Sequence, residues 1–132
     1  MPEKGLGDTS LFIATETDRP IRHDRMPAEI SVCVITVAEL QAGVLAAQTV
    51  ADRAARLATL DHVGELQPLP VDAAAASAWA RLRVEIHQAG RRVSVNDLWI
   101  AAVAIANDLP VVTQNGDFRL LADLGLLSVI EV

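Results

Sequence analysis

The sequence predicts an α/β domain built around a mainly parallel sheet, and three observations support this fold class. Short apolar runs rich in β-branched residues alternate along the chain with longer segments that have the helical period. Turn residues such as Gly90, Pro110 and Gly116 separate these segments. Apolar residues make up 52% of the 132 residues, which is enough to bury one core, so we expect a single domain over residues 1–132.

Two strands are expected near the amino terminus. Residues 4–8 are a weak first strand, because two of them are glycines, and Asp8-Thr9-Ser10 then begins a helix. A polar connection over residues 16–28 leads to the run 30–35, which is β-branched and apolar on both faces. Such a run is typical of the central strands of a parallel sheet.

Helices are expected to dominate the middle of the chain. Thr36 and Glu39 have the T-x-x-E spacing of a capping box, which predicts a helix over residues 36–47. A second helix is expected over residues 49–62. Residues 66–71 are predicted as an edge strand, because each of their two prolines lacks the N–H that a strand ladder needs.

The second half of the chain continues the alternation of helices and strands. Asp72 is placed to cap a long helix over residues 73–89, which Gly90 ends. A helix over residues 95–106 has only apolar residues after Asp97, so we expect it to lie at the centre of the domain. The remaining elements are a strand, a short helix and a strand, over residues 109–113, 118–124 and 127–132.

Four acidic residues lie where a parallel sheet would gather them at one edge. Asp8 ends the first strand, and Glu39 lies one turn beyond the second. Asp117 follows the strand over residues 109–113, and Asp97 begins the central helix. In parallel sheets, binding sites lie beyond the carboxyl ends of the strands.

Each of these acids has a structural explanation when taken alone, since acidic residues are common at helix caps and in first helical turns. Gathered at one edge, however, four carboxylates would repel one another, and their pKa values would rise unless a cation offset the repulsion. Carboxylate oxygens favour a hard cation, Mg²⁺ or Mn²⁺, over Zn²⁺. A site of this kind can activate water and stabilise the leaving oxygen of a phosphodiester.

Several other kinds of site are excluded. The three histidines are far apart and have no cysteine partners, so zinc-ligand spacing is missing, and the sequence has no glycine-rich phosphate loop and no G-x-S-x-G elbow. No apolar run is long enough to span a membrane, and the single Cys33 fits a reducing cytoplasm. The formal charge of −6 is unusual for a nucleic-acid-binding protein unless cations or a basic partner offset it.

Five further residues are candidates for substrate contacts. Thr9, Thr113 and Asn115 are placed to contact phosphate or metal-bound water, although turn formation explains them equally well. Arg91 and Arg92 lie on the approach to the central helix, where they either contact phosphate or form part of a solvated face.

At these positions the sequence resembles the PIN-domain ribonucleases, and in particular the VapC-like toxins of type II toxin–antitoxin systems. The resemblance covers almost the whole chain, because five segments occur in the order and at the spacing of that family. They are Gly7-Asp8-Thr9-Ser10-Leu11-Phe12-Ile13-Ala14, Ile35-Thr36-Val37-Ala38-Glu39-Leu40, Ala80-Arg81-Leu82-Arg83, Asn96-Asp97-Leu98-Trp99-Ile100-Ala101-Ala102 and Val112-Thr113-Gln114-Asn115-Gly116-Asp117-Phe118.

The resemblance implies a PIN-like three-layer α/β/α fold and a Mg²⁺- or Mn²⁺-dependent endoribonuclease that cuts structured RNA such as tRNA or rRNA. It makes four residues the catalytic, metal-binding acids: Asp8, Glu39, Asp97 and Asp117. It also implies a homodimer that is inhibited by a cognate VapB-like antitoxin in a hetero-oligomer. The antitoxin helix would lie in an apolar groove near residues 11–14 and 44–60.

The sequence departs from the family pattern in two places. The first strand is short and contains glycine, and Asn115 stands where many relatives have an acid, which leaves Asp117 as the fourth carboxylate. The alternative function is a catalytically silent PIN-like module that binds RNA or a partner protein, and the intact set of four acids argues against it. A receiver-like phosphoacceptor domain is disfavoured, because it needs a late lysine and Lys4 is the only lysine in the chain.

Overall fold

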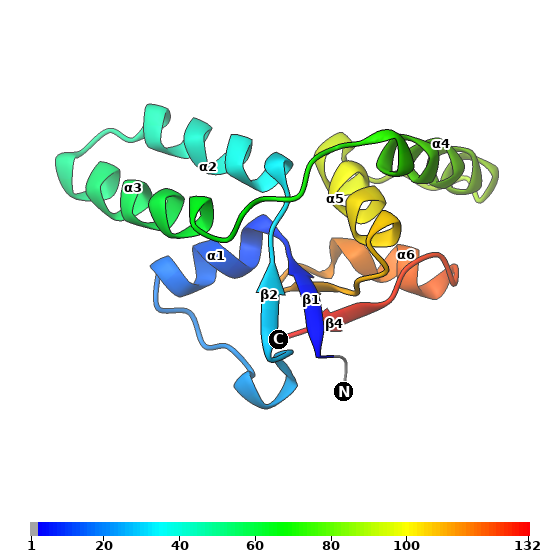
Figure 1. The fold of residues 1–132 in the computed structure, drawn as a ribbon, viewed down its shortest axis with the longest axis horizontal. Coiled ribbons are helices and arrows are strands. Elements are labelled where there is room, and N and C mark those ends of the chain that lie inside the picture. Colours follow the sequence, from blue (N-terminus) through cyan, green and yellow to red (C-terminus); the bar gives the residue numbers. More distant parts are fainter. Residues whose placement is uncertain (1–2) are drawn as a thin grey trace.

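The computed structural model describes residues 3–132, and within them a parallel sheet runs through the centre (Figure 1). Its strands are β1 (Lys4–Gly7), β2 (Glu29–Ser31), β3 (Val111–Thr113) and β4 (Val129–Glu131). Their order across the sheet is β2-β1-β3-β4, and each neighbouring pair is parallel. The carboxyl ends of these strands therefore lie at the same edge of the sheet.

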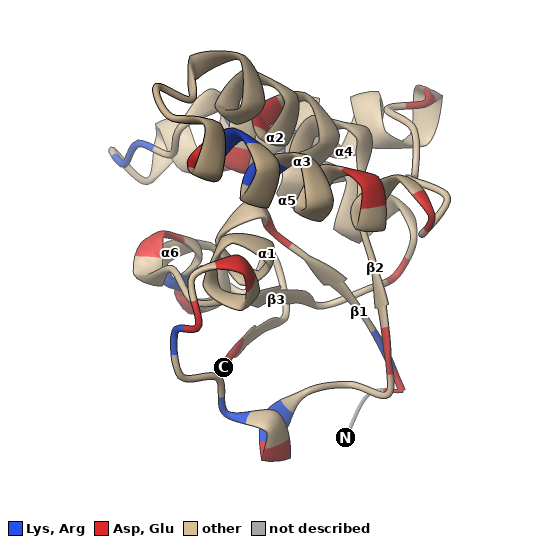
Figure 2. Ribbon diagram, turned by 90° about the vertical axis from the view of Figure 1, so that its left-hand side faces the viewer, with Lys and Arg blue, Asp and Glu red and all other residues tan. Residues whose placement is uncertain are grey.

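Helices fill most of the sequence between the strands. In the described part of the chain the α-helices are α1 (Thr9–Glu16), α2 (Val34–Ala46), α3 (Val50–Gly64), α4 (Ala73–Gln88), α5 (Val95–Ala106) and α6 (Arg119–Asp123). Two 3-10 turns, η1 (His23–Arg25) and η2 (Gly116–Phe118), lie in the connections. The architecture is the three-layer α/β/α arrangement that the sequence predicted. In the view of Figure 2, α2 to α5 lie above α1 and α6, and Figure 1 shows α1 and α6 well apart from each other.

Helix α5 occupies a large hydrophobic cluster, as its apolar sequence predicted. Residues 100–104 are buried, and they share this cluster with Leu6 of β1 and Val111 of β3. Another cluster joins α1, α2 and α3, and its buried members are Phe12, Val32, Leu40 and Val63. Despite the apolar sequence of α5, no helix within residues 3–132 is long and apolar enough to cross a membrane.

The two glycines of β1 are required by close packing. A Cβ atom added to Gly5 would lie 2.5 Å from the side chain of Val112, and one added to Gly7 would lie 3.0 Å from the side chain of Phe12. The glycines that make the first strand look weak in the sequence therefore let β3 and α1 approach it. This close approach brings the end of β1 next to the end of β3.

The second strand is shorter than predicted. It ends at Ser31 instead of continuing over residues 30–35, because the chain turns away to pair with a different segment. The N–H of Leu69 donates to the carbonyl of Val32 at 2.8 Å, and the N–H of Val34 donates to the carbonyl of Leu69 at 3.0 Å. Helix α2 can therefore begin at Val34, two residues before the predicted start.

The capping-box prediction at the start of α2 is wrong. Cys33 is the N-cap residue, in an extended conformation, and its side chain makes no capping hydrogen bond. Thr36 consequently lies inside the helix, where its side chain is fully buried. The T-x-x-E spacing places Thr36 and Glu39 on neighbouring turns of one helix face, which gives both residues a different use.

The predicted edge strand over residues 66–71 is reduced to a single parallel bridge between Leu69 and Cys33. Its two prolines, Pro68 and Pro70, flank Leu69 and cannot donate to a ladder, so the pairing cannot extend. The strands predicted over residues 109–113 and 127–132 are present as the shorter β3 and β4.

Side-chain caps begin three of the predicted helices. Each cap residue accepts a hydrogen bond from the backbone N–H three residues further on. The caps are Asp8 of α1 (3.2 Å), Asp72 of α4 (2.9 Å) and Ser94 of α5 (3.2 Å). Gly90, with φ of +67°, follows the end of α4 in the left-handed conformation that favours glycine at this position.

Candidate functional site

The carboxyl ends of β1 and β3 bring together residues that are far apart in the sequence. Gly7 pairs with Val112 in the parallel register, and the N–H of Asp8 donates to the carbonyl of Val112 at 3.1 Å. Asp8 and Thr113, which follow Gly7 and Val112 in the sequence, therefore lie beside each other. We call the group formed by Asp8, Glu39, Asp97 and Asp117 the acidic edge.

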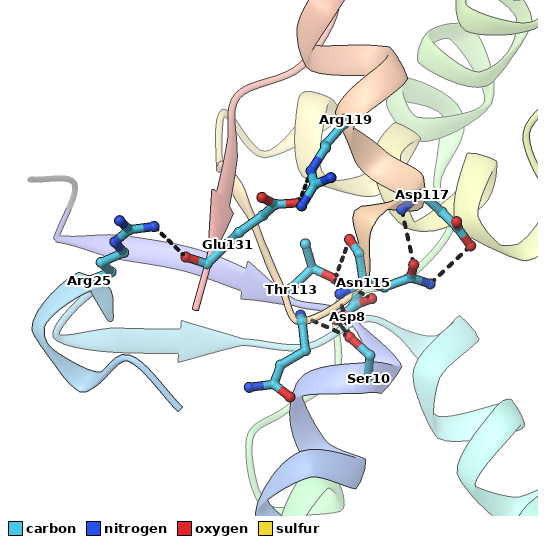
Figure 3. A network of polar contacts seen from close by, with 9 residues as sticks. Asp8, Ser10, Arg25, Thr113, Asn115, Asp117, Arg119 and Glu131 are labelled. Carbon is cyan, nitrogen blue, oxygen red and sulfur yellow. Dashed lines mark hydrogen bonds and ion pairs between the residues drawn. The ribbon is translucent and has the colours of Figure 1, made fainter. Parts of the chain in front are cut away.

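The Asp8 carboxylate is held by hydrogen bonds at both oxygens (Figure 3). Its Oδ1 accepts from the hydroxyl of Ser10 at 2.7 Å and from the N–H of Leu11 at 3.2 Å. Its Oδ2 accepts from the hydroxyl of Thr113 at 2.9 Å. The side chain is only 3% exposed, so these contacts fix one orientation of the carboxylate.

Burial raises the pKa of Asp8 above its usual range. The hydrogen bonds from Ser10, Thr113 and Leu11 lower that pKa in part, and the negative charge of Asp97 raises it further. The partners of Asp8 named here are hydroxyls and a backbone amide, none of which carries a positive charge. The negative charge of Asp8 is therefore stabilised without a cationic side chain at its hydrogen bonds.

Asp97 is the member of the acidic edge whose pKa is raised by the charges of two other members. It lies in the first turn of α5, where the hydroxyl of Ser94 accepts from its backbone N–H. Partial burial is the main cause that raises the pKa of Asp97, and the charges of Asp117 and Glu39 raise it further. The charge of Asp97 in turn raises the pKa of Asp8, so Asp97 is coupled electrostatically to each of the other three acids.

The carboxylate of Glu39, in α2, accepts a hydrogen bond from a side chain of α1. The hydroxyl of Thr9 donates to Oε1 of Glu39 at 2.7 Å. The same hydroxyl lies 3.1 Å from the hydroxyl of the buried Thr36, so three polar side chains of α1 and α2 form one chain of contacts. Because Thr36 and Glu39 share a helix face, both can reach Thr9.

Asp117 is held by Asn115. The side-chain oxygen of Asn115 accepts from the N–H of Asp117 at 2.9 Å, and the side-chain amide donates to Oδ2 of Asp117 at 3.1 Å. The N–H of Asn115 in turn donates to the hydroxyl of Thr113 at 2.8 Å. Asn115 rather than Asp117 is thus the cap of the turn η2, and it links that turn to the residues around Asp8 (Figure 3).

A cavity of about 480 Å³ opens beside Asp97 and Asp117. Both predicted arginines, Arg91 and Arg92, line it, so positive charge lies at the approach to the acidic edge. The other lining residues are Val93, Ser94, Gly116, Arg119, Leu120 and Asp123. The chain has 11 basic residues against 17 acidic ones, and three of the basic ones line this cavity.

Sequence reasoning missed Arg119, which belongs to the same cavity. Its Nε donates to Oε1 of Glu131 in β4 at 2.7 Å, and this hydrogen bond raises the pKa of the guanidinium (Figure 3). Arg25 also donates to the backbone carbonyl of Glu131, at 3.5 Å. No motif indicates Arg119, because its partner becomes a neighbour only through the pairing of β3 with β4. Its position two residues after Asp117 is the one signal in the sequence.

The chemistry of the acidic edge fits a hard cation. All four side chains offer oxygen ligands, and a bound cation would offset the burial and repulsion that raise the pKa of Asp8 and Asp97. Within residues 3–132, no three His, Cys, Asp or Glu side chains are grouped closely enough to surround one metal ion. Asp97 and Asp117 line the cavity, whereas Asp8 and Glu39 are not part of its lining, so the acids of the described residues do not enclose a cation.

Known proteins share this arrangement of elements. Residues 6–124 match the PIN domain family. Ribonuclease VapC5 of Mycobacterium tuberculosis (strain ATCC 25618 / H37Rv) is 50% identical over 131 residues, which cover 99% of this chain and 97% of that protein. Ribonuclease VapC4 of the same organism is 37% identical over 127 residues, covering 96% of this chain and 97% of that protein.

A solved structure agrees with the sequence relatives. The crystal structure of a member of the VapBC family of toxin–antitoxin systems, VapBC-5 from Mycobacterium tuberculosis, matches with a TM-score of 0.91 and 47% identity. The match covers 99% of this chain and 100% of that chain. The family that the sequence resembles is thereby confirmed: this chain belongs to the PIN-domain family and, within it, to the VapC group.

Proposed function

We propose that this chain is an endoribonuclease toxin of a type II toxin–antitoxin system that hydrolyses phosphodiester bonds of structured RNA, such as tRNA or rRNA, with Mg²⁺ or Mn²⁺. The observation that carries the proposal is the buried carboxylate of Asp8, fixed at the end of β1 and coupled to Asp97. Burying a carboxylate without a cationic partner is costly, so a functional need for it is the better explanation. The names of the relatives as ribonucleases support the choice of RNA.

The acidic edge would hold the divalent cation, with Asp8 and Asp97 as its firmest ligands. The cation would supply the charge that activates water and stabilises the leaving oxygen. Ser10 and Thr113 keep both oxygens of Asp8 in place, and the cap at Ser94 keeps the start of α5 in place. Ligands that are fixed before binding lose little conformational freedom when the ion arrives.

The arginines of the cavity would bind the RNA backbone. Arg91, Arg92 and Arg119 line the cavity that leads to Asp97 and Asp117. Because the protein has a net negative charge, these arginines would offset its repulsion of the RNA phosphates. The Nε of Arg119 is bonded to Glu131, and its two terminal nitrogens are left to bind other groups. Such a guanidinium can bind a phosphate through two parallel hydrogen bonds.

Three predicted substrate contacts are better explained as supports for the acids. The side chains of Thr9, Thr113 and Asn115 make their hydrogen bonds to Glu39, Asp8 and Asp117, respectively. We propose that each residue acts on catalysis through the acid that it holds. A direct contact with phosphate or with water at the cation would need these hydrogen bonds to be given up.

A cognate VapB-like antitoxin is the proposed inhibitor, in a hetero-oligomer, and the chain is proposed to form a homodimer in the cytoplasm. A solved structure with 47% identity is described as a member of a toxin–antitoxin family, which supports an antitoxin partner. A mainly apolar cavity of about 540 Å³ lies between α1 and α3, and through Leu11, Phe12 and Ala58 it partly overlaps the groove that the family resemblance implies. Its apolar lining includes Leu11, Phe12, Ile21, Met26, Ile30 and Leu66.

The alternative is a catalytically silent module that binds RNA or protein. The two functions differ in whether an intact acidic edge cuts RNA. The test compares cleavage of end-labelled tRNA and rRNA fragments by the purified protein, with Mg²⁺, with Mn²⁺ and with EDTA. RNA binding without cleavage under both metals would favour the silent module.

Variants of the acidic edge complete this test. Asp8→Asn and Asp97→Asn are expected to abolish cleavage while the circular dichroism spectrum is kept. Asp52→Asn, on the exposed surface of α3, is the matched control and should cut RNA like the unchanged protein. Cleavage that survives in both edge variants would contradict the assignment.

A further inference from the structure

Thr36 has a buried hydroxyl that does not bond to a carbonyl of its own helix, α2. Thr15 and Thr59, which lie within helices, and Thr17, the C-cap residue of α1, donate to the carbonyl four residues earlier in the chain. Thr36 instead lies 3.1 Å from the hydroxyl of Thr9, which is 27 positions away in α1. A fully buried hydroxyl costs free energy unless it is paired, and the polar neighbours of Thr36 are the hydroxyl of Thr9 and the thiol of Cys33, the N-cap residue of α2.

The direction of the hydrogen bonds follows from the number of protons. Thr9 has one hydroxyl proton, and it donates that proton to Oε1 of Glu39, because an ionised carboxylate can only accept. The proton between the two hydroxyls must then come from Thr36. The chain therefore runs in one direction, from Thr36 to Thr9 and from Thr9 to Glu39.

Because of this direction, the two threonines have different roles. Thr9 contacts the acid, whereas Thr36 acts on the acid only through Thr9. Without the donor from Thr36, the hydroxyl of Thr9 loses a partner that fixes its rotation, and its bond to Glu39 weakens. With both donors in place, Oε1 of Glu39 is bound toward α1, and Oε2 remains available to the acidic edge.

We infer that Thr36 is a positioning residue: through Thr9 it holds Glu39 in the orientation that binds the divalent cation. The inference rests on the proposed function of the acidic edge and extends it to a residue that makes no contact with that edge. It also gives a reason for a polar side chain inside the packed face between α1 and α2. A plain packing role would be filled equally well by valine, which has the same shape.

The test measures Mn²⁺ affinity by electron paramagnetic resonance of the free ion, together with kcat and KM for RNA. Thr9→Val is expected to weaken Mn²⁺ binding about tenfold, as for loss of a hydrogen bond to a charged group, and Thr36→Val about threefold. The KM for RNA should stay unchanged. Thr36→Ser, which keeps the hydroxyl, should stay within about twofold of the unchanged protein.

The double variant is the sharpest arm of the test. Because Thr36 acts only through Thr9, the double variant Thr9→Val/Thr36→Val should bind Mn²⁺ as Thr9→Val does, without further loss. Losses that multiply would overturn the inference, as would unchanged Mn²⁺ affinity in Thr36→Val or an affinity in Thr36→Ser as low as in Thr36→Val. Thr17→Val is the control, since the side chain of this exposed C-cap residue bonds to the carbonyl of Ile13, and it should leave Mn²⁺ affinity unchanged.

Two further comparisons separate the possible failures. If Thr36→Val unfolds, Thr36→Ala and Thr36→Ser make the same comparison, because they differ only in the hydroxyl. Mn²⁺ binding that follows the expected pattern in a protein that does not cut RNA would overturn the proposed function but support this inference. Cleavage that requires Mn²⁺ but is unchanged in Thr9→Val and Thr36→Val would support the proposed function and overturn this inference.

Discussion

The hydroxyl of Thr113 donates to Oδ2 of Asp8 at 2.9 Å, although the two residues are 105 positions apart in the sequence. The same hydroxyl accepts from the N–H of Asn115 at 2.8 Å and lies 3.1 Å from the hydroxyl of Ser10. Thr113 is fully buried, so its one hydroxyl joins the end of β3 to the end of β1 and to the turn that carries Asp117. The geometry of the acidic edge depends on this contact.

Replacing Thr113 by valine should therefore harm both stability and catalysis. Thr113→Val keeps the shape but leaves Asp8 and the N–H of Asn115 without a partner, so the free energy of unfolding should fall by about 1–3 kcal/mol. RNA cleavage should fall about tenfold, because the Asp8 carboxylate is free to turn. Urea unfolding and initial cleavage rates measure the two effects, with Thr113→Ser as the control. Full activity in Thr113→Val would show that the contact is dispensable.

The pH dependence of stability should reveal the buried Asp8. Burial raises its pKa, more than the hydrogen bonds from Ser10, Thr113 and Leu11 lower it, so the folded protein binds this proton more tightly than the unfolded chain. The resulting stabilisation is complete at low pH and is lost as the pH rises from about 4 through the pKa of the folded state. Asp97 changes stability in the same direction.

Asp8→Asn removes this titration. In EDTA, the variant should gain stability relative to the unchanged protein as the pH rises above about 4, and the gain should level off beyond the folded pKa. Thermal unfolding over a series of pH values measures the difference, with the surface variant Asp52→Asn as the reference. Parallel stability curves for Asp8→Asn and the unchanged protein would contradict the raised pKa.

Asn115→Asp should make the acidic edge more dependent on cations. The side-chain amide of Asn115 donates to Oδ2 of Asp117, and an aspartate would replace this donor with a second negative charge. We expect a lower melting temperature in EDTA and a larger increase on addition of Mn²⁺ than in the unchanged protein. Differential scanning calorimetry with and without Mn²⁺ measures both values. An equal Mn²⁺ effect in the two proteins would place position 115 outside the cation's surroundings.

Arg119→Gln should weaken RNA binding through the phosphate backbone. The loss of one phosphate contact should lower kcat/KM about fivefold and reduce the slope of log affinity against log salt by about 1. Arg22→Gln, an exposed arginine that does not line the cavity, is the matched control. The salt series is measured by fluorescence anisotropy with labelled RNA and the Asp8→Asn protein as background. An unchanged salt slope would remove Arg119 from the RNA path.

The parts of the fold that depend on local pattern were predictable from the sequence. The caps at Asp72 and Ser94, the glycine after α4 and the apolar helix α5 each follow from a few neighbouring residues. The meeting of the ends of β1 and β3, beside Asp8, was predictable for a different reason. Parallel strands end at the same edge of a sheet, so residues just beyond their carboxyl ends converge whatever their sequence separation.

The remaining parts depend on contacts that no local pattern contains. The T-x-x-E spacing of Thr36 and Glu39 is the same at a helix start and inside a helix, and the pairing with Leu69 decides where α2 begins. Arg119 becomes part of the cavity because β4, with Glu131, lies next to β3. In both cases a segment distant in sequence determines the role of a residue.

The most direct test of the central claim is a crystal structure grown with Mn²⁺ and measured at a wavelength where manganese scatters anomalously. The acidic edge as proposed requires an anomalous peak between the carboxylates of Asp8 and Asp97, within coordination distance of both. The peak should disappear in crystals of Asp97→Asn grown under the same conditions. Crystals with Mn²⁺ bound only elsewhere on the protein, or with no peak at this edge, would contradict the assignment of Asp8 and Asp97 as metal ligands.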